Sequence, residues 1–141
     1  MSRFLGRISL MLIGALLAIA TSAQAGERIN PKDLNRSYGF SCSGTAGPSP
    51  FTEIGQVTCD GRDTCSGTGI MNSPTGAFVT TVVGHFTLDP NGIGFITYDV
   101  SAGGTILFQL HIQFVVLDGG REIRGLPIEP GFDVICNLKE Q

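Results

Sequence analysis

From residue 37 onward, apolar and polar side chains alternate with a period of two, and Gly, Pro, Asn and Asp interrupt the alternation at short intervals. This period is typical of β-strands with one buried face, and the interruptions are typical of tight turns. Within residues 106–117 the even positions are apolar, whereas the central odd positions are Gln109, His111 and Gln113. The pattern predicts an all-β domain whose longest strand has one buried and one wet face. The apolar positions of that strand are Ile106, Phe108, Leu110, Ile112, Phe114 and Val116.

The clearest predicted hairpin joins residues 80–88 to residues 93–100. Its connection runs Asp-Pro-Asn-Gly from Asp89 to Gly92. Pro presets φ for a type I turn, and Gly suits the left-handed position that follows. This chemistry predicts a three-residue loop with a bulge at Gly92, and it brings the bulky side chains of both strands onto one face. The expected pairs are Phe86 with Ile96, Gly84 with Tyr98 and Val82 with Val100.

A second hairpin is expected at Gly119 and Gly120, because a two-residue Gly-Gly loop fits a primed turn. In that register Ile123 shares the buried face of Val116. Four charged residues of this hairpin are the candidate interaction residues: Asp118, Arg121, Glu122 and Arg124. Asp118 and Arg121 are expected to face each other across the turn, and Glu122 and Arg124 to share the outward face. That face offers a carboxylate–guanidinium pair to a partner, and the alternative is a charged hairpin that discourages edge pairing.

Further strands are expected at residues 37–42, 51–59, 64–71 and 132–138, which brings the total to eight. One segment has a helical pattern, because Asn30 fits an N-cap and Pro31 suits the first helical position, so one or two turns are predicted before Ser37. Eight strands joined by short turns favour a closed antiparallel up-and-down barrel, since closure removes exposed edges. The alternative is a β-sandwich. A single β-barrel domain is therefore predicted over residues 37–141, after an N-terminal segment at 26–36.

The first 25 residues have the order of a secretory signal peptide. Arg3 and Arg7 precede an apolar run over residues 8–20, and the stretch ends on Ala23-Gln24-Ala25. Cleavage is expected after Ala25, and the alternative is an uncleaved anchor, for which the run is shorter than the roughly 20 residues of a membrane-spanning helix. We therefore expect a periplasmic or extracellular protein with no membrane span in its mature chain.

Export gives the four cysteines an oxidising environment, in which three disulfide pairings are possible. Cys59 and Cys65 flank a turn-forming stretch between two predicted strands, so their side chains come within reach of each other. Cys42 and Cys136 lie on the first and last strands, which a closed barrel makes neighbours. The predicted disulfides are therefore Cys59–Cys65 and Cys42–Cys136. A metal site is the alternative, but the chain has no Cys-x-x-Cys pair.

Charge and motifs exclude several classes of function. After residue 25 the chain has seven Lys and Arg against twelve Asp and Glu, a net charge of −5, which argues against binding nucleic acid or anionic membranes. His85 and His111 are expected on outward faces, too far apart to share a metal. Asp60 and Asp63 lie in a turn that lacks the spacing of a calcium loop. No catalytic residue, metal or cofactor is therefore predicted.

Three segments, residues 34–40, 84–94 and 115–125, resemble a group of small exported bacterial β-barrel proteins of uncharacterised function. The architecture is also similar to lipocalin-like and allene-oxide-cyclase-like barrels, a likeness that implies a fold and no activity.

The predicted function is a non-enzymatic binding or interaction protein. One alternative is a carrier of a small apolar ligand in the barrel lumen, although nine phenylalanines favour a filled interior. Another is a cofactor-independent isomerase or cyclase, which would need Glu, His or Tyr pointing inward. The predicted register places Tyr98 inward and places His85, His111 and Glu122 outward.

Overall fold

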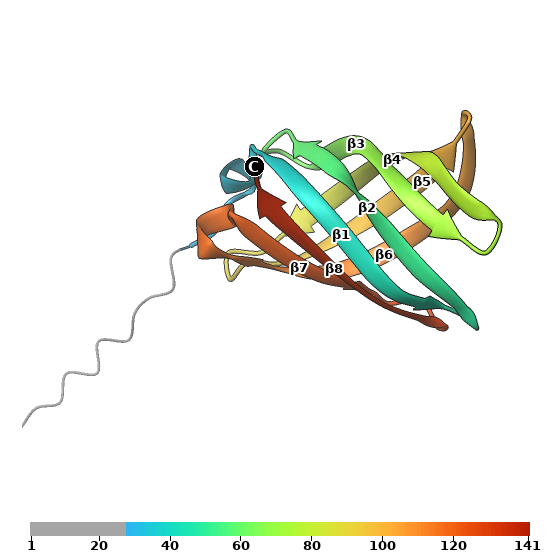
Figure 1. Ribbon diagram of the computed structural model, residues 1–141. Coiled ribbons are helices and arrows are strands. Elements are labelled where there is room, and N and C mark those ends of the chain that lie inside the picture. Colours follow the sequence, from blue (N-terminus) through green and yellow to red (C-terminus); the bar gives the residue numbers. More distant parts are fainter. Residues whose placement is uncertain (1–27) are drawn as a thin grey trace, which may run out of the picture.

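The computed structural model describes residues 28–141, in which eight antiparallel strands close into a barrel in sequence order (Figure 1). The predicted signal peptide at 1–25 lies outside the described residues. The up-and-down barrel that the alternation predicts is confirmed. Its strands are β1 (Ser37–Ala46), β2 (Ser49–Cys59), β3 (Thr64–Ser73), β4 (Gly76–Leu88), β5 (Ile93–Ala102), β6 (Thr105–Leu117), β7 (Glu122–Pro127) and β8 (Phe132–Glu140).

The β4–β5 hairpin has the predicted loop and register. The Asp89 backbone N–H donates to the Ile93 carbonyl at 2.9 Å, the Asp89 side chain accepts from the Asn91 backbone N–H at 2.8 Å, and Gly92 has a φ of 80°. Phe86 pairs with Ile96, Gly84 with Tyr98 and Val82 with Val100. Local turn chemistry therefore sets the register of the central strands.

The β6–β7 hairpin is also built on the predicted primed turn. Gly119 and Gly120 have φ values of 59° and 93°, and the Arg121 N–H donates to the Asp118 carbonyl at 3.1 Å. Positive φ at both central positions defines a type I′ turn, described as the short element η2 (Asp118–Gly120). Val116 pairs with Ile123, so the two side chains share the buried face.

One expectation for β6 is wrong. Ile106, the first apolar position of the predicted buried face, is 62% exposed. The β5–β6 register shifts between Val100 and Ser101, so that Val100 pairs with Phe108 whereas Ser101 pairs with Ile106. A β-bulge of this kind inserts an extra residue and changes the direction of the strand. The alternation places Leu110, Ile112, Phe114 and Val116 in the interior.

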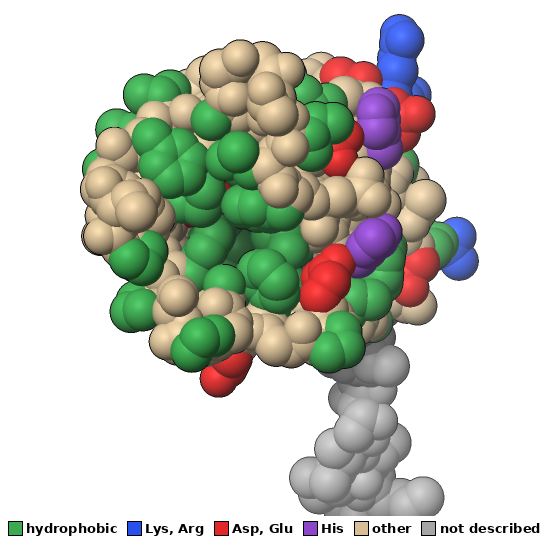
Figure 2. All heavy atoms as spheres, turned by 90° about the vertical axis from the view of Figure 1, so that its right-hand side faces the viewer, with side chains coloured by type: hydrophobic (Ala, Val, Ile, Leu, Met, Phe, Trp, Pro, Cys, Tyr) green, Lys and Arg blue, Asp and Glu red, His purple; other side chains and the backbone are tan. Residues whose placement is uncertain are grey.

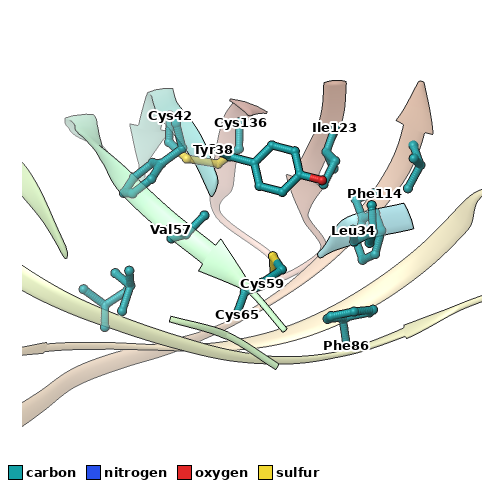
Figure 3. Packing of buried hydrophobic residues seen from close by; sticks show 14 of the residues in the cluster. Leu34, Tyr38, Cys42, Val57, Cys59, Cys65, Phe86, Phe114, Ile123 and Cys136 are labelled. Atoms are coloured by element: carbon teal, nitrogen blue, oxygen red, sulfur yellow. A yellow bond between two sulfur atoms is a disulfide. The ribbon is translucent and has the colours of Figure 1, made fainter. Parts of the chain in front are cut away.

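Pairing of β1 with β8 closes the barrel, and Cys42 lies directly opposite Cys136 on these strands. The two cysteines form a disulfide with a Cα–Cα distance of 4.1 Å (Figure 3). Cys59 and Cys65 form the second disulfide across the β2–β3 hairpin. Both pairs are the ones that the predicted strand order brings together.

The segment before β1 forms a single 3₁₀ turn, η1 (Pro31–Leu34), which confirms the short helical turn predicted before Ser37. The Asp33 carboxylate accepts from the Asn30 backbone N–H at 2.7 Å and stabilises the start of the turn. Leu34 is 1% exposed and Ile29 9%, and both belong to the barrel core. The apolar residues of this segment therefore extend the core beyond the strand ends.

Candidate ligand site in the barrel interior

The two ends of the barrel differ in what covers them. At the closed end, η1 lies beside the turns β2–β3 and β6–β7: a Cβ on Gly61 would meet Asn35 at 2.7 Å, and one on Gly120 would meet the Asp33 carbonyl at 2.5 Å. The open end is formed by the turns β1–β2, β3–β4, β5–β6 and β7–β8 (Figure 1). Figure 2 looks onto the open end and shows a hollow lined by hydrophobic side chains.

A cavity of about 70 Å³ lies between the closed end and the middle of the lumen. Leu34 from η1 lines it, and Tyr98 is the one lining residue with a side-chain hydroxyl group. Its wall is otherwise apolar. The lining residues are Leu34, Phe40, Cys42, Val57, Cys59, Cys65, Phe86, Ile96, Tyr98, Ile112, Phe114, Ile123, Gly125, Cys136 and Leu138.

A buried polar pair lies on the open-end side of this cavity. Glu53 on β2 is 2% exposed and Thr80 on β4 is fully buried, so both side chains belong to the interior. The Thr80 hydroxyl donates to Glu53 Oε1 at 2.6 Å. β2 and β4 are not neighbours, because β3 lies between them. The contact therefore spans an intervening strand inside the lumen.

Gly69 on β3 leaves room for this contact. A Cβ at Gly69 would lie 3.0 Å from each of three atoms: Glu53 Oε1, Thr80 Oγ1 and Phe40 Cζ. The side chain of any larger residue at this position would crowd both oxygen atoms of the hydrogen bond. The absence of a side chain on the middle strand therefore lets Glu53 and Thr80 meet, and it brings the carboxyl beside Phe40, which lines the cavity.

Burial shifts the acidity of the interior groups. It raises the pKa of the Glu53 carboxyl, and the hydrogen bond from Thr80 offsets part of that rise. Burial also raises the pKa of the Tyr98 hydroxyl, and Glu53 raises it further when it is ionised. No Lys or Arg within residues 28–141 is buried. The lumen therefore favours the neutral acid at Glu53.

An aromatic pair lies on the open-end side of the lumen. Phe51 on β2 and Phe108 on β6 contact edge to face, with ring centroids 6.4 Å apart. In the closed order of eight strands, β2 and β6 lie on opposite sides. The two rings therefore meet across the lumen, and any ligand that enters from the open end must pass or displace them.

The four predicted interaction residues lie on one hairpin but have different partners. Arg124 pairs with Glu122 at 2.7 Å, as their shared face predicts. Arg121 Nε lies 3.8 Å from Glu140 on β8, so its side chain pairs there and not with Asp118. Whether this hairpin binds a protein partner stays a prediction.

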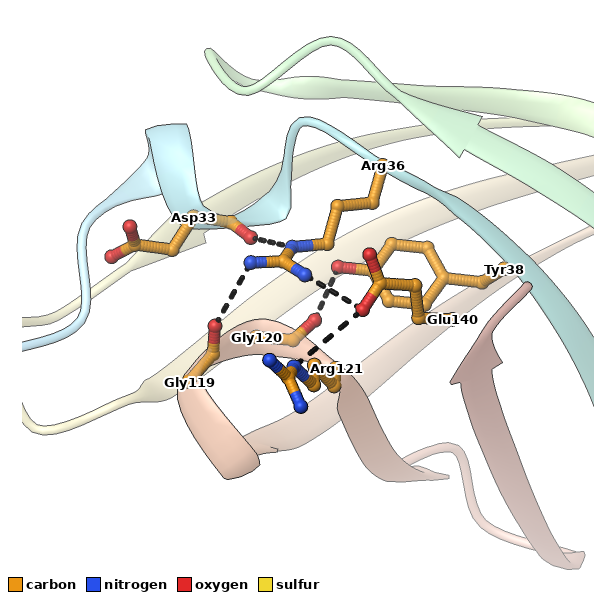
Figure 4. A network of polar contacts seen from close by, with 7 residues as sticks. All are labelled: Asp33, Arg36, Tyr38, Gly119, Gly120, Arg121 and Glu140. Atoms are coloured by element: carbon orange, nitrogen blue, oxygen red, sulfur yellow. Dashed lines mark hydrogen bonds and ion pairs between the residues drawn. The ribbon is translucent and has the colours of Figure 1, made fainter.

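The Arg121 contact belongs to a polar network at the closed end (Figure 4). Arg36 donates to Glu140 at 2.7 Å and to the Asp33 carbonyl at 2.8 Å, and the Tyr38 hydroxyl donates to the Gly120 carbonyl at 2.6 Å. Burial raises the pKa of Tyr38 to about 12. The network joins η1, η2 and the end of β8, which indicates a structural role.

His111 holds the β7–β8 turn at the open end. Its Nδ1 lies 2.7 Å from Glu129 Oε1, and its backbone N–H donates to the same oxygen. Burial alone would raise the pKa of Glu129, but these hydrogen bonds outweigh it and leave the pKa below its ordinary value. His85 contacts Thr64 at 3.2 Å on another part of the wall.

The described residues contain no cluster of possible metal ligands. Among residues 28–141, no three His, Cys, Asp or Glu side chains converge as metal ligands. The helices in this range are also too short to cross a bilayer.

Comparison with known proteins adds no relative. No protein family model, curated protein or solved structure matches the chain. The suggested likeness to small exported bacterial β-barrel proteins stays a prediction.

The residues that give this interior its polar character, Glu53 and Thr80, were not among the predicted site residues. The alternation contains the signal, because Phe51, Val57 and Cys59 share the inward parity of Glu53. A charged side chain in a strand is ordinarily expected to face water. For Glu53 this expectation conflicts with the alternation of inward and outward residues along the strand. The alternation gives the correct orientation.

Proposed function

We propose that this protein is an exported, non-enzymatic binding protein that holds a small, mainly apolar molecule in its lumen. The observation that carries the proposal is an apolar cavity of about 70 Å³ in a barrel with one covered and one open end. Small-molecule sites are typically concave, mostly apolar and supplied with a few polar groups. The two disulfides favour an oxidising compartment, in agreement with the predicted signal peptide.

The size of the cavity limits the ligand. An engineered protein cavity of about 150 Å³ accepts benzene, so about 70 Å³ accepts only a short alkyl group. A larger ligand extends from the cavity toward Phe51 and Phe108 and requires those rings to rotate. Because Phe108 is only partly buried, such a movement disturbs fewer contacts than one in the closed half.

Native mass spectrometry of the exported protein tests the proposal. We expect an added mass on the wild type that is lost when Ile112→Phe fills the cavity, since Ile112 lines it. The control is Ile135→Phe, at a position that is 57% exposed and points away from the lumen, and it should keep the added mass. A wild type without bound molecules, or equal loading of Ile112→Phe, contradicts the proposal.

A second candidate function is a cofactor-independent isomerase or cyclase, which the inward positions of Glu53 and Tyr98 favour. A carboxyl group with a raised pKa suits general acid catalysis. Chromatography of the molecule before binding and after release separates the two functions. An unchanged molecule supports the carrier, whereas conversion that Glu53→Gln abolishes supports the enzyme.

A further inference from the structure

We propose that Glu53 is the polar anchor of the lumen and that it selects an uncharged ligand whose carbonyl oxygen accepts a hydrogen bond from the carboxyl group. This inference rests on the proposed function, because it names the class of ligand that the interior takes. It also explains why an otherwise apolar interior contains a carboxylic acid.

The hydrogen bonding of Glu53 leaves one position for a ligand. Thr80 donates to Oε1 at 2.6 Å, so Oε1 is occupied as an acceptor. In the neutral acid Oε2 can then carry the proton, and Oε2 has no hydrogen-bond partner among the described residues. Oε2 is not one of the fully enclosed unpartnered atoms of these residues, so a ligand atom can reach it. A carbonyl oxygen is the simplest partner, because it accepts a hydrogen bond and brings no charge into the lumen.

The charges around Glu53 argue against a cationic ligand. All seven Lys and Arg of residues 28–141 lie on the surface or only partly buried, so none compensates a carboxylate in the lumen. An ion pair with a ligand would need both charged groups to leave water, and that cost often exceeds their attraction. A hydrogen bond from the neutral Glu53 carboxyl group to an uncharged ligand avoids this desolvation cost.

The position of the carboxyl defines the shape of the ligand. Glu53 Oε1 and Phe40 Cζ lie equally close to the vacant Cβ position of Gly69, at 3.0 Å each, and Phe40 lines the cavity. A molecule with a short alkyl end in the cavity therefore places its next atoms beside Glu53. The remainder points toward Phe51 and Phe108, so the expected ligand has a polar atom between two apolar parts.

Stability alone does not favour a carboxyl at this position. A buried acid with a single hydrogen bond is less favourable than an aliphatic side chain of similar volume. Residues that bind ligands commonly lower the stability of their host protein in this way. Glu53→Leu is accordingly expected to fold at least as stably as the wild type, which makes it a usable test.

Three probes with a seven-atom chain test the inference: 4-heptanone, heptane and dipropylamine. Their dissociation constants are measured by NMR titration at about pH 4, below the ordinary pKa of a glutamate, where a carboxyl group with a raised pKa is neutral. In Glu53→Leu the affinity for the ketone relative to heptane should fall by about tenfold. Glu53→Gln retains a donor and should lose less. For the wild type we expect dipropylamine to bind more weakly than 4-heptanone.

The failures of the two proposals are distinguishable. Equal ketone-to-heptane ratios in the wild type and Glu53→Leu overturn the role of Glu53 and leave the lumen as a ligand site. Tighter binding of dipropylamine than of 4-heptanone overturns the uncharged ligand class. If none of the three probes enters the wild-type lumen, the proposed function fails for ligands of this size, and the inference fails with it.

Discussion

The closed and open ends of the barrel are held by different kinds of contact. At the closed end, Tyr38, Arg36 and Glu140 join three separate segments through hydrogen bonds of 2.6 to 2.8 Å (Figure 4). Leu34 is 1% exposed and belongs to the same core cluster as Tyr38 (Figure 3). Polar and apolar contacts here stabilise the same arrangement.

The open end has fewer such contacts. Gly47, Gly76 and Gly103 in its turns have positive φ, and a Cβ on any of them would meet no atom within 4 Å. Glu129 and His111 secure the β7–β8 turn. The difference indicates that the closed end preserves the shape of the barrel, whereas the turns of the open end have free space around them.

The largest expected effect concerns the disulfides. Loop entropy predicts that Cys42→Ala/Cys136→Ala lowers the free energy of unfolding by about 4–5 kcal/mol, because this bridge closes a long loop. Cys59→Ala/Cys65→Ala should cost about 2 kcal/mol, since its loop is short. Urea denaturation of both double variants measures the difference, and equal losses would show that the β1–β8 closure does not depend on its bridge.

The next largest effect concerns the buried Leu34 side chain at the closed end. Leu34→Ala should lower the free energy of unfolding by about 3 kcal/mol, because it empties a fully enclosed position. Ile106→Ala at the open end, where the side chain is 62% exposed, should change it by less than about 0.5 kcal/mol. Thermal denaturation of the pair checks the contrast, and similar losses would contradict it.

A smaller effect separates the two inward tyrosines. Tyr38→Phe removes the buried hydrogen bond to the Gly120 carbonyl and should cost about 1–2 kcal/mol. Tyr98→Phe in the cavity wall should be nearly neutral, because its hydroxyl forms no hydrogen bond with the residues described. Should Tyr98→Phe prove the more damaging variant, the hydroxyl of Tyr98 has a structural role after all.

The smallest effect appears only as a dependence on pH. The raised pKa of Glu53 means that the folded state holds this proton more tightly than the unfolded state. Its contribution to stability is complete below the ordinary pKa of the unfolded chain and declines as the pH rises through the folded-state pKa. The difference in unfolding free energy between the wild type and Glu53→Gln should follow this decline, and a difference that does not change with pH would refute it.

The fold could be predicted closely because its determinants are local. The Asp89–Gly92 and Gly119-Gly120 turns set registers that the alternating apolar residues independently require. Strand order then placed Cys42 beside Cys136. Strand ends were less accessible: β4 begins at Gly76 and not at Thr80, because small and polar residues in that stretch are equally compatible with a loop.

The interior could not be predicted to the same depth. Leu34 lines the interior only because the closed strands surround it. Its burial therefore depends on the whole barrel and not on its own segment. The Glu53–Thr80 contact likewise depends on Gly69 of a third strand. A contact that involves three strands cannot be predicted from the residue pattern of any one of them.

The location of the chain ends has a practical consequence. Ile29 bonds to the β4–β5 turn through Pro90, and Gln141 bonds to Ser37 at the start of β1, so both ends of the described chain lie on the covered side of the barrel (Figure 1). A fluorescent fusion or a biosensor tether attached at either terminus would point the entrance toward the surrounding solution. A lumen that binds the proposed neutral ligands would then stay accessible in the immobilised protein.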